Sequence, residues 1–188
     1  MKKRIEFISP EDFKQLIKSC KDKELKVAMI LGFGSGLRIS EILGYQRQFK
    51  YVKKVKQIDT SKIPPLTPDK IDLVKHQIVI DNAKGGKWRV APTSPILKPE
   101  HIKLLPLKVK RRTLQNKFYS LTKRVLKKRI SFHILRHGFG NYAVNVLKMP
   151  MPMVQQYMGH SSVSTTGVYA KANPEESIKE YWSAMGGE

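Results

Sequence analysis

The sequence predicts a mainly α-helical α+β domain with one small antiparallel β-sheet, on the basis of three observations. Apolar residues recur at helical spacing over most of the chain. Two short β-prone runs, Gln77–Ile80 and Lys87–Val90, flank a turn that contains two glycines, which is the pattern of a hairpin. The length of 188 residues and the apolar content of 40% suffice for one compact domain with its own core, or for two very small ones.

The first part of the chain predicts three helices. Ser9 has the form of an N-cap, because Pro10 and then two acids follow it, as in the first turn of a helix. The apolar run Leu25–Phe33 suits a buried helix that ends in glycines. The segment Arg38–Leu43 has apolar residues at helical spacing and predicts the third helix.

Helical spacing is lost between Tyr45 and Pro68. This stretch is first basic and then rich in proline, and we interpret it as an excursion or loop before the hairpin. After the hairpin, four prolines predict an irregular chain up to residue 106. Helical spacing returns from about Thr113 to Lys128 under a basic face. The remaining segments with a helical pattern are His133–Leu147, Met153–Met158, Thr165–Ala170 and Pro174–Met185.

Charge is the unusual feature of the composition. The chain has 36 Lys and Arg against 15 Asp and Glu, a formal net charge of +21. Five basic residues and no acid lie between Gln46 and Gln57. Twelve basic residues lie from Lys98 to Arg129, and the one acidic residue in that stretch is Glu100. Such an excess repels itself in the folded state, so a polyanion is the expected partner. Nucleic acid is therefore favoured over the alternative of a merely Lys-rich, solvated surface.

Other classes of protein fit the sequence less well. No apolar stretch reaches the roughly 18 residues needed to span a bilayer, and acids in the first twelve residues interrupt any signal-peptide core. The single cysteine, Cys20, rules out an intramolecular disulfide and a multi-cysteine zinc site. We therefore expect a cytoplasmic protein that does not associate with a membrane.

Individual motifs allow competing interpretations. Gly32–Gly36 resembles a dinucleotide-binding loop, but Leu37 replaces the third glycine and no βαβ pattern follows, which favours a turn between helices. His133 and His137 are four residues apart but lack the glutamate of a helical zinc motif. Tyr169 follows a Ser/Thr-rich turn and is, taken alone, an ordinary packing residue. None of these motifs assigns a function by itself.

Taken together and in order, four segments resemble the tyrosine recombinase, or phage integrase, family. They are GLRISEIL (36–43), NAKGGKWRVAP (82–92), HILRHGFGNYAV (133–144) and QQYMGHSSVSTTGVYA (155–170). The resemblance runs from about Ser9 to Met185 and implies the catalytic-domain fold of an Xer-type recombinase or integrase. Because relatives have a further DNA-clamping domain before this region, we expect 1–188 to be a single catalytic domain without the N-terminal core-binding domain.

The resemblance implies a site-specific recombinase that breaks and rejoins DNA without metal or other cofactor. Tyr169 matches the nucleophile, which forms a 3′-phosphotyrosyl link and releases a 5′-hydroxyl. Arg38 and Arg136 match the two arginines that clamp the phosphate, a task that suits bidentate guanidinium groups. The other matched positions are His133 (activation of the nucleophile, or donation to the phosphate), His160 (donation to the phosphate), Lys84 with Lys87 as the alternative (general acid), Glu41 (orientation of an arginine or histidine) and His137 (packing).

Double-stranded DNA is the expected partner. The candidate DNA-binding residues are Lys87, Arg89, Arg47, Lys53, Lys54, Arg111 and Arg112, although the excursion that holds three of them could equally be a solvated loop. Pro174–Met185 matches the final helix that docks on a neighbouring protomer in relatives, and folding back on its own domain is the alternative. Two other functions remain open: a DNA-binding accessory protein of this fold that does not cleave, and a type IB topoisomerase-like enzyme.

Overall fold

The computed structural model describes residues 7–46, 49–52, 55–58, 62–83 and 87–159. Three helices open the fold, as expected: α1 (Pro10–Ser19), α2 (Lys23–Gly34) and α3 (Ile39–Leu43). Ser9 caps α1 by accepting a hydrogen bond from the backbone N–H of Asp12 at 3.0 Å. The turn between α2 and α3 includes Gly36 at φ +66°, so these glycines connect two helices rather than a strand and a helix.

The small antiparallel sheet is confirmed and has a third strand. The predicted hairpin consists of β6 (Gln77–Ala83) and β7 (Lys87–Pro92). β5 (Ile71–Asp72) pairs with the other edge of β6, which gives the order β5-β6-β7. A short 3-10 turn, η1 (Pro68–Lys70), leads into β5. A two-residue strand is too short to show an alternating pattern, which is why the sequence did not predict it.

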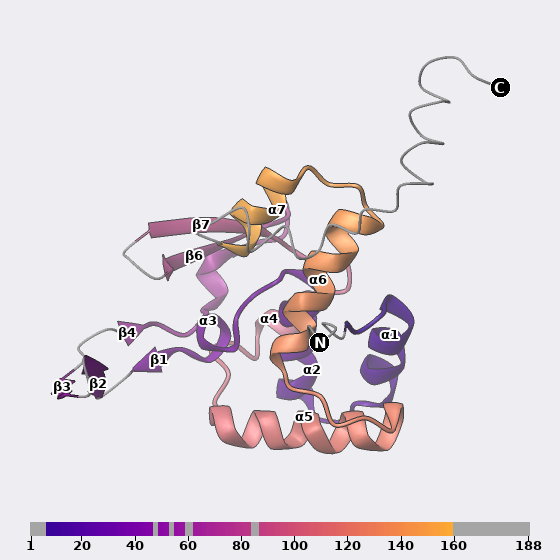
Figure 1. The fold of residues 1–188 in the computed structure, drawn as a ribbon. Coiled ribbons are helices and arrows are strands. Elements are labelled where there is room, and N and C mark those ends of the chain that lie inside the picture. Colours follow the sequence, from indigo (N-terminus) through magenta and orange to yellow (C-terminus); the bar gives the residue numbers. More distant parts are fainter. Residues whose placement is uncertain (1–6, 47–48, 53–54, 59–61, 84–86, 160–188) are drawn as a thin grey trace, which may run out of the picture.

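The segment interpreted as an excursion or loop is an excursion that contains four short strands, so the expectation of a loop was wrong for its first part. β1 (Tyr45–Gln46) pairs with β4 (Lys62–Ile63), and β2 (Phe49–Val52) pairs with β3 (Val55–Ile58), all antiparallel. The two ladders follow one another along a single hairpin that projects from the body of the molecule (Figure 1). The sequence did not predict these strands, because lysines interrupt their β-prone residues.

The second half of the described chain is helical. It contains α4 (Pro99–Ile102), within the stretch expected to be irregular, then α5 (Arg111–Leu126), α6 (His133–Asn145) and α7 (Met151–Met158). α5 and α7 each begin two residues before the expected start, and α6 ends two residues before the expected end. The helices expected at 165–170 and 174–185 lie outside the described residues.

Helix α2 is the centre of the core. Apolar residues are buried on all sides of it, since α6 and α5 pack against it and α1 joins the same cluster. α7 packs on β7 and, with α6, forms a second, smaller apolar cluster. The fold class is therefore as predicted: mainly helical, with a small antiparallel sheet. Within the described part of the chain, no helix has the length and apolarity to cross a bilayer.

Candidate active site

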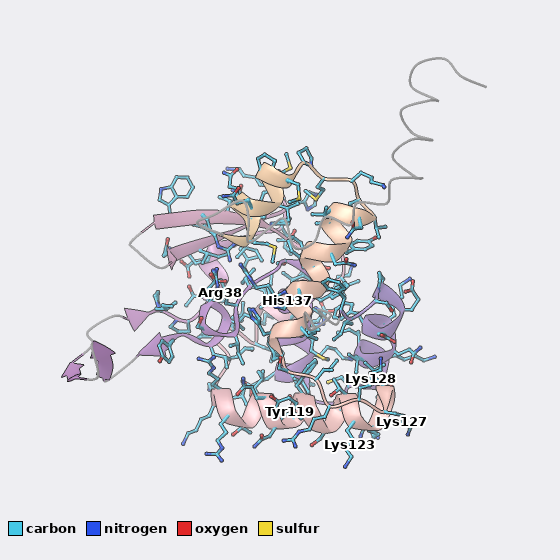
Figure 2. The ribbon with its side chains drawn as sticks, in the orientation of Figure 1. Arg38, Tyr119, Lys123, Lys127, Lys128 and His137 are labelled. Carbon is cyan, nitrogen blue, oxygen red and sulfur yellow. The ribbon has the colours of Figure 1, made fainter. Side chains whose placement is uncertain are left out.

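Four elements converge at the end of α7. Arg38 is the N-cap residue of α3, Glu41 lies in that helix, Arg89 comes from β7, and Arg136 from α6. Three of these residues, Arg38, Glu41 and Arg136, are ones to which the family resemblance assigns roles. Figure 2 shows Arg38 at the start of α3 and His137 on α6, both near the middle of the molecule. The tertiary fold thus brings together residues that are far apart in the sequence.

Glu41 is the acidic centre of this cluster. Its Oε1 accepts from Nη1 of Arg38 at 2.8 Å, and its Oε2 accepts from Nη2 of Arg89 at 2.8 Å and from the backbone N–H of Arg38 at 2.7 Å. The Glu41 and Arg89 side chains are 2% and 5% exposed, while that of Arg38 is 34% exposed. Arg38 is therefore the member of this trio that reaches solvent.

Three arginines donate to three consecutive carbonyls at the end of α7. Arg89 donates to the carbonyl of Tyr157, Arg136 to that of Met158, and Arg38 Nη2 to that of Gly159 at 3.1 Å. The last carbonyls of a helix have no partner within it and carry the negative end of its dipole, so cations are stabilising there. We call these three arginines with Glu41 the arginine cluster.

Two glycines allow the arginine cluster to close. Gly36 has φ +66°, and a Cβ there would lie 2.5 Å from the Phe139 ring. Its carbonyl accepts from Nη1 of the buried Arg136 at 2.5 Å, which ties α6 to the turn before α3. Gly159 has φ +58°, and a Cβ there would lie 2.7 Å from Cδ of Arg89. A side chain at Gly36 would therefore displace the Phe139 ring, and one at Gly159 would displace Arg89.

The charges in the arginine cluster perturb each other. Burial opposes ionisation of Glu41, but Arg89, Arg38 and Arg136, with the hydrogen bond from the Arg38 N–H, outweigh it and lower the pKa of this carboxyl. Burial and then repulsion by Arg38 lower the pKa of Arg89 against the attraction of Glu41. Arginine remains charged nonetheless, so three positive charges face one carboxylate.

His133 and His137 lie one helical turn apart on α6, with their rings edge to face and the centroids 4.6 Å apart. His133 keeps surface exposure. Loss of hydration, then the neighbouring His137, Arg136 and other cationic residues, lower its pKa from 6.5 to about 4. Burial and Arg136 also lower the pKa of His137. Both imidazoles are therefore neutral at neutral pH in the free protein.

The remaining predicted residues divide into two groups. Lys84, His160, Tyr169, Arg47, Lys53 and Lys54 lie outside the described residues, and the side chain of Lys87 is not described either. Arg111 and Arg112 are exposed at the start of α5, and the Arg111 guanidinium stands 5.7 Å from the centre of the Tyr45 ring. Within the described residues, no group of three His, Cys, Asp or Glu could hold a metal ion.

Arg89 is the residue whose place differs most from expectation. A direct DNA contact calls for an exposed side chain, but Arg89 is buried and paired with Glu41, while its neighbour Trp88 is 72% exposed. Alternation along a strand puts consecutive side chains on opposite faces. Hydrophobicity would put Trp88 inside, so the sequence pattern pointed to the wrong face. The prediction of a strand implies that side chains alternate between its two faces, but it does not show which of Trp88 and Arg89 faces inward.

Comparisons with known proteins agree with this fold. A family model described as the phage integrase family matches residues 98–176. The tyrosine recombinase XerA of Pyrococcus horikoshii is 24% identical over 181 residues, which cover 87% of this chain and 56% of that protein. XerC of Rickettsia canadensis is 26% identical over 165 residues, covering 85% of this chain and 50% of that protein. The chain thus spans about half the length of the curated relatives it matches.

Solved structures show the same fold. A crystal structure of XerA recombinase has a TM-score of 0.64 at 20% identity and covers 97% of this chain and 64% of that one. The catalytic domain of bacteriophage HP1 integrase has a TM-score of 0.56 at 20% identity and covers 94% of this chain and 95% of that one. The Tn1549 transposon integrase in complex with transposon right end DNA has a TM-score of 0.67 at 17% identity, covering 98% and 67% of the two chains. Its sequence relatives and the family model thus make this chain similar to the tyrosine recombinases of the phage integrase family, and the solved structures show that it shares their fold.

Proposed function

We propose that this chain is the catalytic domain of a site-specific recombinase and cleaves and rejoins DNA through a 3′-phosphotyrosyl link to Tyr169. The arginine cluster carries the proposal. Its three guanidinium groups against the one carboxylate of Glu41 make a net charge of +2. The transition state of phosphoryl transfer gathers negative charge on its non-bridging oxygens, and a preorganised cationic site stabilises that charge.

The two arginines of the family motif differ in what they offer a phosphate. Arg38 is partly exposed and holds Glu41 through one nitrogen and the Gly159 carbonyl through the other, so it receives the DNA phosphate first. Arg136 is buried on the carbonyls of Gly36 and Met158, and it reaches the phosphate by exchanging one of these acceptors for a phosphate oxygen. Each group stays charged throughout, which a proton-exchanging side chain would not.

Proton transfer in this proposal uses His133 and three residues that lie outside the described part of the chain. The lowered pKa of His133 leaves a neutral imidazole that accepts the proton of the Tyr169 phenol as the tyrosine attacks. The 5′-oxygen leaves with a proton from Lys84, or from Lys87 in its place, and His160 donates a hydrogen bond to the phosphate. No electron transfer occurs, because the phosphodiester bond is exchanged for a phosphotyrosyl bond.

The partner in this proposal is double-stranded DNA. The net charge of +21 supports it, as does the DNA bound to the Tn1549 integrase that shares the fold. We also propose self-association on DNA through Pro174–Met185, and phosphate contacts by the exposed Arg111 and Arg112. Formation of a covalent protein–DNA link distinguishes the proposed enzyme from an accessory protein of the same fold that only binds DNA.

A nicked DNA library tests the nucleophile. Duplexes of randomised sequence with a nick trap a cleaved complex, because the short 5′-hydroxyl fragment diffuses away and cannot be rejoined. We expect wild type to form an SDS-resistant protein–DNA adduct in EDTA. Tyr169→Phe removes the hydroxyl that attacks, so the adduct is absent while DNA affinity stays within about twofold of wild type.

The matched control is Tyr119→Phe on α5, which removes a tyrosine hydroxyl but leaves the ring on which Arg129 stacks, with the guanidinium 4.9 Å from its centre. This variant should form the adduct at the wild-type rate. An adduct formed by Tyr169→Phe excludes Tyr169 as the nucleophile. Wild-type protein that binds the library but forms no adduct with any sequence supports the accessory protein that does not cleave.

A further inference from the structure

We propose that Arg89 is a positioning residue for strand cleavage. From β7, this one buried side chain binds both Glu41 and the end of α7, and so it holds in place the phosphate-binding Arg38 and the start of the segment that leads to His160 and Tyr169. The inference rests on the proposed function and adds a residue to which the family resemblance gave no catalytic or positioning role.

The first link runs from Arg89 to Arg38 through Glu41. The carboxylate is divided between the two arginines, with Oε1 on Arg38 and Oε2 on Arg89, both at 2.8 Å. Among the described residues, Oε2 without Arg89 would accept only from the Arg38 backbone N–H, and the carboxylate would lose its hydrogen bond to the sheet. Because Arg38 is the exposed member, a turn of Glu41 changes the direction in which the Arg38 guanidinium points.

The second link runs from Arg89 to α7. Nη1 of Arg89 donates to the carbonyl of Tyr157, the first of the three consecutive carbonyls that the cluster holds. The stem of Arg89 also packs against Gly159, since a Cβ there would lie 2.8 Å from Nε. Gly159 directly precedes His160, so Arg89 fixes the point from which the rest of the proposed site begins.

Burial makes Arg89 a positioning residue rather than a phosphate ligand. Its side chain is 5% exposed, so DNA does not reach it. Its Nε also has no hydrogen-bond partner among the described residues, which is a penalty that an apolar side chain of similar size would avoid. Replacing a buried charge network with apolar groups is often neutral or stabilising, so stability alone does not explain a charged residue here. The hydrogen bonds from Arg89 to two separate helices, α3 and α7, explain why the residue is charged.

The test uses Arg89→Met, which keeps much of the length and removes both bonds, and Arg89→Lys, which keeps the charge but lacks the fork that binds two partners. Lys70→Met is the matched control, because it removes one positive charge from the 2.6 Å surface pair with Asp81 next to β6. Two quantities are measured: the single-turnover rate of adduct formation on a trapped library sequence at saturating DNA, and the dissociation constant for that DNA.

We expect both Arg89 variants to form the adduct roughly 10- to 100-fold more slowly with unchanged DNA affinity, as for a misplaced catalytic group. Lys70→Met should match wild type. Adding Glu41→Gln to Arg89→Met should slow the reaction little further, because both changes break the same link. A wild-type rate in Arg89→Met overturns the proposal. So does a loss of DNA affinity with an unchanged rate at saturation, which makes Arg89 a DNA contact.

A measurement without DNA separates this inference from the proposed function. The ¹H–¹⁵N resonance of the Arg38 Nε–H group reports the surroundings of that guanidinium in the free protein. It should shift or broaden in Arg89→Met and stay in place in Lys70→Met. If wild type never forms an adduct, the proposed function fails, and this resonance alone decides whether Arg89 positions Arg38. If Arg89→Met does not fold, Arg89→Lys takes its place in every comparison with the same expected results.

Discussion

At the residue scale, the same arginines have opposite effects on the charged forms of Glu41 and His133. Glu41 is buried, yet it stays ionised because two guanidinium groups and a backbone N–H hold it. His133 has no such anionic partner in the described part of the chain, and loss of hydration with the nearby Arg136 and Arg38 disfavours its charged form. In the free protein, Glu41 is therefore negatively charged within the arginine cluster, while His133 is neutral at neutral pH.

This difference predicts a pH dependence of stability. Unfolded histidine takes up a proton below about pH 6.5, whereas folded His133 does so only near pH 4. The unfolded state thus binds more protons in this window, and the free energy of unfolding falls as the pH drops through it. Urea titrations should show this fall from pH 7 to 5, with a smaller slope for His133→Gln.

The lowered pKa of His137 adds to the slope that remains in His133→Gln, with the same sign. Glu41 does not contribute in this window, because its lowered pKa means that its stabilisation is lost only below its ordinary value of 4.5. Comparison of the two proteins above pH 7 measures the packing effect of the substitution separately. Equal slopes for wild type and His133→Gln would contradict the depressed pKa.

At the scale of an element, helix α5 ends without the glycine that often follows a helix. Its C-cap is Lys127 at φ +56°, in the left-handed region where glycine is favoured. The amine of Lys127 donates to the carbonyl of Arg124 at 3.2 Å, which satisfies one of the last free carbonyls. Lys127, Lys128 and Lys123 gather at this end of α5, with Tyr119 nearer its middle (Figure 2).

Glycine at this position should stabilise the protein. Lys127→Gly removes the strain of a left-handed lysine and loses only an exposed hydrogen bond, so we expect a gain of about 0.5–1 kcal/mol in the free energy of unfolding. Lys128→Gly is the matched control, because it removes the same charge where φ is not positive, and it should be neutral or destabilising. Urea denaturation measures both. Equal losses in the two variants would contradict the argument.

The distribution of charge governs behaviour at the scale of the whole molecule. Between Glu100 and Glu175 the chain has no acidic residue, and this stretch includes α5, α6 and α7. Part of the acid elsewhere is occupied, since Asp22 pairs with Lys117 at 2.5 Å and Glu41 lies within the arginine cluster. The excess positive charge therefore stays available on the surface to a polyanion.

DNA affinity should fall steeply with salt as a result. If binding neutralises six phosphates, the association constant drops roughly 10³-fold between about 50 and 200 mM salt, because condensed counterions are released. Filter binding or fluorescence anisotropy measures the slope. Arg111→Gln with Arg112→Gln should reduce that slope by about two, if each contacts one phosphate. A flat salt dependence would remove the basis for phosphate contacts.

Caps, apolar spacing and turn residues in the sequence predicted most of the helices and strands, and elements without these features were missed. Ser9 and the apolar spacing after it specify α1 because a cap and its helix are neighbours in the sequence. The hairpin of β6 and β7 is specified in the same way by its turn. The β1–β4 excursion was missed because lysines interrupt its β-prone residues, and β5 because two residues carry no period.

The arginine cluster depends on contacts that no local pattern contains. The order of the motifs was enough to select Arg38, Glu41 and Arg136, but not to show what they bind. Arg38 reaches the carbonyl of a residue 121 positions away, and Glu41 binds an arginine 48 positions away. Such pairs form only when α3, β7, α6 and α7 pack together, so the tertiary fold decided that Arg89 faces inward and that three guanidiniums meet at one helix end. The periodicity of a sequence shows which face of a helix or strand is apolar. Which polar side chains then meet one another depends on how these elements pack in the tertiary structure.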